Sequence, residues 1–360
     1  MPPEKLVRSS NIELYRIITM LLIVAHHYVV NSGLLQEAIK EPTTVKSIVF
    51  MTIGMWGKTG INCFVLITGY FMCKSKITLQ KFLKLLLEVE LYSVLFGIIF
   101  IVAGYTSLSL STLIEICSPI HNVKDGFTSC FLLFFLFIPF LNILIQNLSQ
   151  KLHLLLLALS AGIYTIIGSS YFYGVTFNYI TWFCVLYFIA SYIRLYPIYK
   201  GTDIRFWGYC SLATILIACA SMISILFASQ WLNKPFMADM AYYFVADSNK
   251  VLAVSVAVCT FMFFKNLNIK HSKLINTIAA SSFGVLLIHA NSDAMRQWLW
   301  RDTLQNVRFF HTEYAYYHVI LAVLTIYFCC TLIDYLRIRI IEKPMVDTAM
   351  KLIDQIKGKI

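Results

Sequence analysis

Arg16 and His27 are two polar residues within the first apolar segment of the chain, IELYRIITMLLIVAHHYVV. A helix turns by about 100° per residue, so eleven residues bring His27 to within roughly 20° of the Arg16 face and about 16 Å along the axis. His26 lies roughly 80° away from that face. Because ionisable groups inside a bilayer are costly, the pattern predicts a functional site. It would have a cation toward one membrane face and a proton-transfer group nearer the other.

Glu13 strengthens this prediction because it lies three residues before Arg16, on nearly the same helix face and near enough to pair with it. A purely structural explanation stays open. Arg16 can extend to the lipid headgroups, and a buried histidine can simply bond to a backbone carbonyl. The alignment of Glu13, Arg16 and His27 on one face favours the functional interpretation.

The second apolar segment and the residues after it contain further basic groups. Lys58 lies in the glycine-rich run GKTGINCFVLITGYF (57–71), where glycine allows either a broken helix or a close approach of two helices. In the following KSKITLQKFLK, Lys81 and Lys84 share a helix face just inside the membrane. They are either ordinary cytoplasmic charge or a clamp for the phosphates of a nucleotide-like donor. Glu88, four residues after Lys84, is expected to pair with it.

His289 and Asn291 follow a late apolar run, and Asp293 and Arg296 come shortly after, at the predicted outer face. A histidine at a helix end is either bonded locally or part of a site. The outer segments are also rich in Trp, Tyr and Arg, which is typical of interfacial aromatic belts. The sharper alternative is a platform on which sugar rings stack.

Composition and hydropathy predict the elements that position these residues. The 360-residue chain is 59% hydrophobic and 13% charged, with a mean hydropathy of +0.73, whereas soluble domains carry about 25% charged residues. We therefore predict an all-α integral membrane protein whose first apolar segment is retained as a span. About ten spans are expected, near 12–30, 47–73, 82–104, 127–148, 153–170, 178–196, 207–228, 248–264, 274–291 and 313–335.

The net charge of +11 follows the expected membrane topology. With the N-terminus inside, most of the 29 Lys and Arg residues fall in inner segments, so both termini are expected to be cytoplasmic. The basic excess therefore indicates topology and anionic or phosphorylated ligands, and no nucleic acid is expected as a partner. The ten cysteines form no C-x-x-C pair and no zinc pattern, so neither a disulfide framework nor a metal site is predicted.

The chain is predicted to have two parts. Residues 1–343 form a multi-span membrane domain, and residues 344–360 form a cytoplasmic amphipathic tail. Apolar residues in the tail recur at helical spacing with lysines between them, which is typical of a helix lying in the membrane interface. No internal repeat stands out, which disfavours a transporter built from duplicated halves.

Several segments, in order, resemble the acyltransferase-3 family of integral membrane acyltransferases, most closely its stand-alone bacterial polysaccharide O-acetyltransferases. Arg16 and His27 match the Arg-x10-His signature of that family. Residues 57–71 resemble its Gly-Tyr segment, with Thr68 in place of the usual serine. The later similar segments are FIPFLN (137–142), WFCVLYFIASYIR (182–194), SFGVLLIH (282–289) and IEKP (341–344). The likeness covers nearly the whole chain.

The resemblance implies that residues 1–343 transfer an acyl group, expected to be acetyl, from acetyl-CoA bound from the cytoplasm. The acceptor would be a hydroxyl of a cell-surface polysaccharide or of a lipid-linked glycan precursor, at the bacterial inner membrane. The residues expected in each role are catalytic His27, Arg16 and Glu13; donor-binding Arg16, Lys81, Lys84 and Lys58; and acceptor-binding His289, Asn291 and Asn62. Where Lys81 and Lys84 stand, the family usually has arginine, which binds phosphate through two parallel hydrogen bonds.

Two mechanisms are compatible with the sequence. His27 either takes the proton of the attacking hydroxyl as a general base, or carries the acyl group itself as a covalent relay. The alternative function is a transporter or flippase of a lipid-linked glycan that uses the same buried charges, and a catalytically silent sensor is a third. Whether the chain forms a homo-oligomer stays open.

Overall fold

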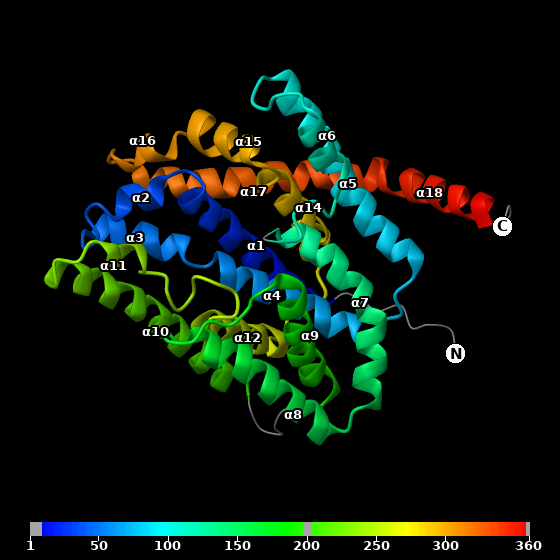
Figure 1. Cartoon of the computed structure of the whole chain (residues 1–360), viewed down its shortest axis with the longest axis horizontal. Coiled ribbons are helices and arrows are strands. Elements are labelled where there is room, and N and C mark those ends of the chain that lie inside the picture. The colour runs from blue at the N-terminus through cyan, green and yellow to red at the C-terminus, as the bar shows by residue number, and fades with distance from the viewer. Residues whose placement is uncertain (1–8, 125, 197–202, 358–360) are drawn as a thin grey trace.

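The computed structural model describes residues 9–124, 126–196 and 203–357. The structure is 77% helical, and the described residues contain no strand (Figure 1). The predicted all-α class is therefore confirmed.

The helices are joined mostly by short connections. In chain order they are α1 (Ser10–Val30), α2 (Leu34–Ala38), α3 (Val45–Gly54), α4 (Gly57–Met72), α5 (Leu79–Val102), α6 (Leu110–Cys117), α7 (Phe127–Asn147), α8 (Gln150–Ala161), η1 (Gly162–Ile166), η2 (Ile167–Ser169), α9 (Tyr179–Leu195), α10 (Ile204–Trp231), α11 (Phe236–Asp239), α12 (Val251–Asn266), α13 (Lys273–Ala280), α14 (Ser282–His289), α15 (Asp293–Arg296), η3 (Gln297–Thr303), α16 (Asn306–Phe310), α17 (Ala315–Ile340) and α18 (Glu342–Lys357).

Within the described ranges, seven helical segments are long and apolar enough to cross a membrane: Ser10–Val30, Val45–Met72, Leu79–Val102, Phe127–Asn147, Gln150–Ser169, Ile204–Trp231 and Ala315–Ile340. A pair bent by 92°, Lys273–His289 with Asp293–Thr303, makes eight if it counts as one span. The other two predicted segments are the shorter apolar helices α9 and α12. The integral membrane class is thus confirmed. The count of ten spans and the cytoplasmic termini stay predictions.

α1 lies in the middle of the bundle, with α17 on one side and α3 and α4 on the other (Figure 1). Three glycines let α3 and α4 approach it. A Cβ at Gly54, Gly57 or Gly60 would lie only 2.8 Å from Val29, 2.3 Å from His26 or 2.6 Å from Ile23. The span is also interrupted at Met55 and Trp56, between α3 and α4. The glycine-rich run 57–71 is therefore a continuous helix whose glycines allow close packing, and the break in the span lies just before it.

α14 ends at His289 and packs against α17 through Gly284. A Cβ at Gly284 would lie 2.1 Å from Oδ1 of Asp334, whose side chain is fully buried. The missing side chain therefore makes room for the Asp334 carboxylate, and this fit sets how closely α14 and α17 pack.

α18 covers most of the predicted tail 344–360, although residues 358–360 lie outside the described part of the chain. It contacts α5 and α17 and extends beyond the bundle in Figure 1. Val346 is buried, whereas Leu352 and Ile356 are largely exposed. Exposed aliphatic side chains alternating with lysines fit a helix lying in the membrane interface.

Gly284→Ala is expected to destabilise the protein by about 1–3 kcal/mol, the usual cost of overpacking, because the new methyl group would displace the Asp334 carboxylate. The measurement is the midpoint of thermal unfolding of the purified protein in detergent. Gly162→Ala is the matched control, since no atom lies within 4 Å of a Cβ there. An equal midpoint for both variants would contradict the tight fit of α14 on α17.

Candidate active site

A cavity of about 320 Å³, called the pocket below, is lined by residues of seven helices, α15 with Arg296 among them. It is lined by the C-terminal half of α1, the middle of α5, the end of α14 and the first turns of α4, α7 and α9. Residues 118–122, which precede α7, also contribute to the lining. Both histidines of α1, His26 and His27, face this pocket.

His27 and His289 form a hydrogen-bonded pair at the pocket. Nδ1 of His27 lies 2.9 Å from Nε2 of His289, and Nδ1 of His289 lies 2.6 Å from the carbonyl oxygen of Val285. A carbonyl only accepts, so Nδ1 of His289 carries the proton and Nε2 of the neutral ring accepts. His27 then donates from Nδ1 and keeps a lone pair on Nε2. That nitrogen can act as a base or as a nucleophile.

His26 is held differently from His27. Its Nδ1 lies 2.5 Å from the carbonyl oxygen of Gly54, and its ring packs against Gly57. The His26 and His27 ring centroids are 5.4 Å apart.

Within the described residues, no three His, Cys, Asp or Glu side chains come together so that they could hold a metal ion.

Two cations and an amide line the pocket beside the histidines. Nζ of Lys58 donates to the hydroxyl of Tyr179 at 2.7 Å, and both residues line the pocket. Arg296 lines it from α15 and pairs with Asp293 at 2.6 Å. Asn291 also lines it, and its Nδ2 donates to the carbonyl oxygen of Leu287 at 3.1 Å. Lys58, predicted to bind donor phosphates, therefore lies near His27 and not beside Lys81 and Lys84.

Arg16 lies beyond one end of the pocket, paired with Glu13. Nε of Arg16 is 3.6 Å from Oε2 of Glu13, whose side chain is buried. Met20, one helical turn from Arg16, lines the pocket, and so does Phe64. The Arg16 guanidinium lies 6.0 Å from the centre of the Phe64 ring. The expected Glu13–Arg16 pair is thus present, and Arg16 approaches Phe64, a residue of the pocket lining, without lining the pocket itself.

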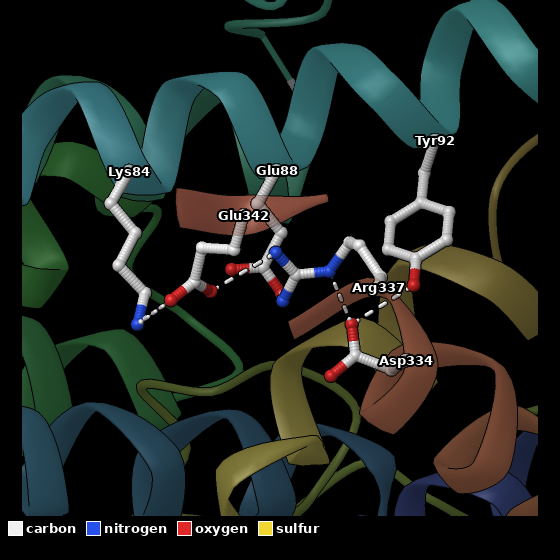
Figure 2. Close-up of polar contacts among 6 residues, drawn as sticks. All are labelled: Lys84, Glu88, Tyr92, Asp334, Arg337 and Glu342. Carbon is white, nitrogen blue, oxygen red and sulfur yellow. Dashed lines mark hydrogen bonds and ion pairs between the residues drawn. The ribbon is translucent and has the colours of Figure 1, made fainter. Parts of the chain in front are cut away.

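A second polar cluster is centred on Arg337 of α17, which is almost fully buried (Figure 2). Arg337 forms ion pairs with Glu88 of α5 at 2.9 Å, with Asp334 one turn earlier at 2.7 Å, and with Glu342 of α18 at 3.2 Å. One guanidinium therefore ties three helices together.

Lys84 belongs to the edge of the same cluster (Figure 2). Its Nζ lies 2.8 Å from Glu342, and its side chain is half exposed. The expected ion pair with Glu88 is therefore wrong, because Glu88 pairs with Arg337 and Lys84 with Glu342. Tyr92 of α5 donates to Asp334 at 2.9 Å. Its own carbonyl oxygen accepts from Asn291 at 3.3 Å, which connects the cluster to the pocket lining.

The two remaining predicted residues lie outside the pocket lining. Lys81 is exposed, and its Nζ donates to Ser75 at 2.6 Å and to the carbonyl oxygen of Lys76 at 2.7 Å. Asn62 is fully buried, donates to the carbonyl oxygen of Ser248 at 2.6 Å and accepts from Trp182 at 2.9 Å. Because both ends of its amide are occupied, this geometry favours a packing role for Asn62.

The sequence did not single out several residues that line the pocket. Tyr179 is the first residue of α9, and Ser118, His121 and Asn122 come from the connection before α7. No local spacing relates these residues to α1. The one signal in the sequence is that the segments between the spans are rich in aromatic and polar residues.

Comparison with known proteins identifies the family. Residues 9–334 match the family model described as an acyltransferase domain, the acyltransferase-3 type. No curated protein and no solved structure matches the chain. The match covers every helix that lines the pocket, including the segments with His27 and His289. The chain therefore belongs to the acyltransferase-3 family of membrane acyltransferases.

Proposed function

We propose that the protein transfers an acyl group, acetyl in the simplest case, from acyl-CoA to a hydroxyl of a cell-surface polysaccharide or lipid-linked glycan precursor. Family membership supports acyl transfer in general. The observation that carries the proposal is the His27–His289 pair, which leaves Nε2 of His27 as a base at a pocket inside a membrane bundle.

In direct transfer, Nε2 of His27 takes the proton of the acceptor hydroxyl as its oxygen attacks the thioester carbonyl. The tetrahedral intermediate then collapses, the C–S bond breaks, and the CoA thiolate takes the proton back from the imidazolium. The Lys58 ammonium, which lines the same pocket, is a suitable group to stabilise the oxyanion. In a relay, the same Nε2 would attack the thioester carbonyl, and the C–S bond would break to release the CoA thiolate. The hydroxyl oxygen would then take the acyl group from the nitrogen, and the hydroxyl proton would go to the thiolate.

His289 acts as a positioning residue in this proposal. Its Nδ1 proton is committed to Val285, so its Nε2 accepts from His27 and holds that ring in one tautomer. When His27 gains a proton on Nε2, the same hydrogen bond stabilises the resulting cation.

The donor would approach from the Arg16 end of the pocket. The rise of about 16 Å from Arg16 to His27 is comparable to an extended pantetheine arm, so CoA phosphates near Arg16 would let the acyl group reach His27. Lys84 and Lys81 remain candidates for the outer phosphates, since Lys84 is half exposed and Lys81 is also exposed. Lys58, beside Tyr179 at the pocket, fits the reacting end of the donor better than its phosphates.

The acceptor and the setting are also part of the proposal. The protein would act in the bacterial inner membrane with both termini in the cytoplasm and with the glycan reaching His27 from the outer side. Asn291 lines the pocket beside His289 and is suited to contact the acceptor. No observation favours the transporter or flippase alternative over acyl transfer.

His27→Ala is expected to lower acyl transfer by about 10²- to 10⁴-fold, the usual contribution of a general base. Mass spectrometry of the surface glycan from cells that make each variant measures the effect. His26→Ala is the matched control, because His26 bonds to Gly54 and not to His289, and it should keep most of the activity. Acyl groups retained in His27→Ala but lost in His26→Ala would overturn the assignment.

His289→Leu is expected to lower kcat by about 10- to 100-fold with little change in KM, because His27 loses the acceptor for its Nδ1 proton. His289→Gln keeps an oxygen near the former Nε2 position and should restore most of the rate. The assay is transfer from labelled acetyl-CoA in membranes containing the full chain. Equal rates in the two variants would show that His289 only fills space.

A further inference from the structure

The pocket carries an excess of positive charge. Lys58 and Arg296 supply this charge from two different helices, and the histidines that also line the pocket, His26, His27 and His121, are counted as neutral. Among the described residues that form its lining, none is Asp or Glu. In an apolar bundle, such a cavity attracts a ligand that brings negative charge with it.

Lys58 keeps its charge uncompensated. The partner of its ammonium is the neutral hydroxyl of Tyr179 at 2.7 Å, and the centre of the Tyr179 ring lies 5.3 Å away. None of the ion pairs found in the described part of the chain includes Lys58. A cation near the start of a helix within a span is costly unless it serves a ligand.

Arg296 is only loosely compensated. Its pair, Asp293, is 93% exposed and well solvated, so the interaction contributes little and can be exchanged. The guanidinium keeps further N–H groups that can bind a planar or tetrahedral anion through two hydrogen bonds.

The backbone adds to the positive electrostatic potential in the pocket. α4, α7 and α9 each begin at the pocket and contribute residues of their first turn to its lining, Gly57, Phe127 and Tyr179. The N-terminal end of a helix carries a partial positive charge, so these three ends add to the positive potential of the two cations.

We infer that the acceptor carries an anionic group, a carboxylate or a phosphate, close to the hydroxyl that is acylated, and that Lys58 and Arg296 bind it. This inference rests on the proposed acyl transfer and specifies its substrate class. The donor does not supply the anion, because a thioester at His27 has its phosphates about 16 Å away, at the other end of the pantetheine arm. The anionic group would hold the acceptor so that its hydroxyl faces Nε2 of His27.

The first test identifies the acylated residue by mass spectrometry and NMR of glycan from cells with and without the chain. Acyl groups on a uronic acid, or on a sugar that bears a phosphate, support the inference. Acyl groups on a neutral sugar with no adjacent anion overturn it while leaving the proposed function intact. If no glycan is acylated, the proposed function fails and the inference falls with it.

The second test uses membranes with the full chain in neutral lipid, labelled acetyl-CoA, and the isolated acceptor before and after carboxyl reduction or dephosphorylation. The wild-type chain is expected to lose about tenfold or more in kcat/KM on the neutralised acceptor, as for loss of a charge-assisted hydrogen bond. Whichever treatment has this effect identifies the anion as carboxylate or phosphate. Equal rates on treated and untreated acceptor would contradict the inference.

Variants locate the effect in the pocket. Lys58→Gln with Arg296→Gln should remove the preference for the charged acceptor, while Lys58→Arg with Arg296→Lys should keep it. Arg301→Gln is the matched control, because Arg301 is an exposed residue of η3 that does not line the pocket. A preference that persists in the double glutamine variant would overturn the assignment of these two residues. Equal slowing of charged and neutral acceptors would indicate that Lys58 and Arg296 stabilise only the oxyanion.

Discussion

The hydrogen bond between His27 and His289 joins residues 262 positions apart, and much of the bundle serves to hold it. An imidazole in an apolar interior must have its N–H groups satisfied, because an unpaired donor there costs far more than in water. The bond to Val285 fixes His289, His289 fixes His27, and one nitrogen is left over for chemistry. This hydrogen bond forms only if the packing of α1 and α14 holds the two imidazole rings within hydrogen-bonding distance.

Two glycine contacts and one ion cluster set that distance. Gly57 lets α4 close on α1 at His26, and Gly284 lets α14 close on α17 at Asp334. Arg337 then links α5, α17 and α18 through three carboxylates (Figure 2). Buried ion pairs add little net stability but are costly to break, so such a cluster mainly selects one arrangement of the helices. The position of His289 therefore depends partly on Gly284, Asp334 and Arg337, which do not line the pocket.

Much of the fold and part of the site could be predicted from the sequence, because both follow from local spacing and hydropathy. Each predicted apolar segment is helical, although 47–73 and 274–291 are each divided between two helices. Glu13 pairs with Arg16 as their spacing indicated. The four-residue spacing predicted Glu88 as the partner of Lys84, but the partner is Glu342, which belongs to a helix far along the chain. Such contacts depend on how different helices pack together, and residue spacing within one helix gives no information about that packing.

The same limit applies to the pocket. Spacing along α1 predicts that Arg16 and His27 share one face, yet only His27 lines the cavity, and Arg16 approaches the lining residue Phe64. The partner of His27 could not be deduced from α1 alone, because α14 brings it from the other end of the chain. Asn62, in a segment that resembles the family, is occupied by Trp182 and Ser248 instead of facing the cavity.

The length of α9 bears on the thickness of the membrane beside the pocket. α9 has 17 residues and so rises about 25 Å, less than the roughly 30 Å hydrocarbon core of a typical bilayer. Its first residue, Tyr179, lines the pocket. A helix that is too short for the bilayer is accommodated by local thinning or by residues that reach outward. In the proposed reaction, a bilayer thinned beside α9 would shorten the distance between the cytoplasmic donor and a glycan on the outer side.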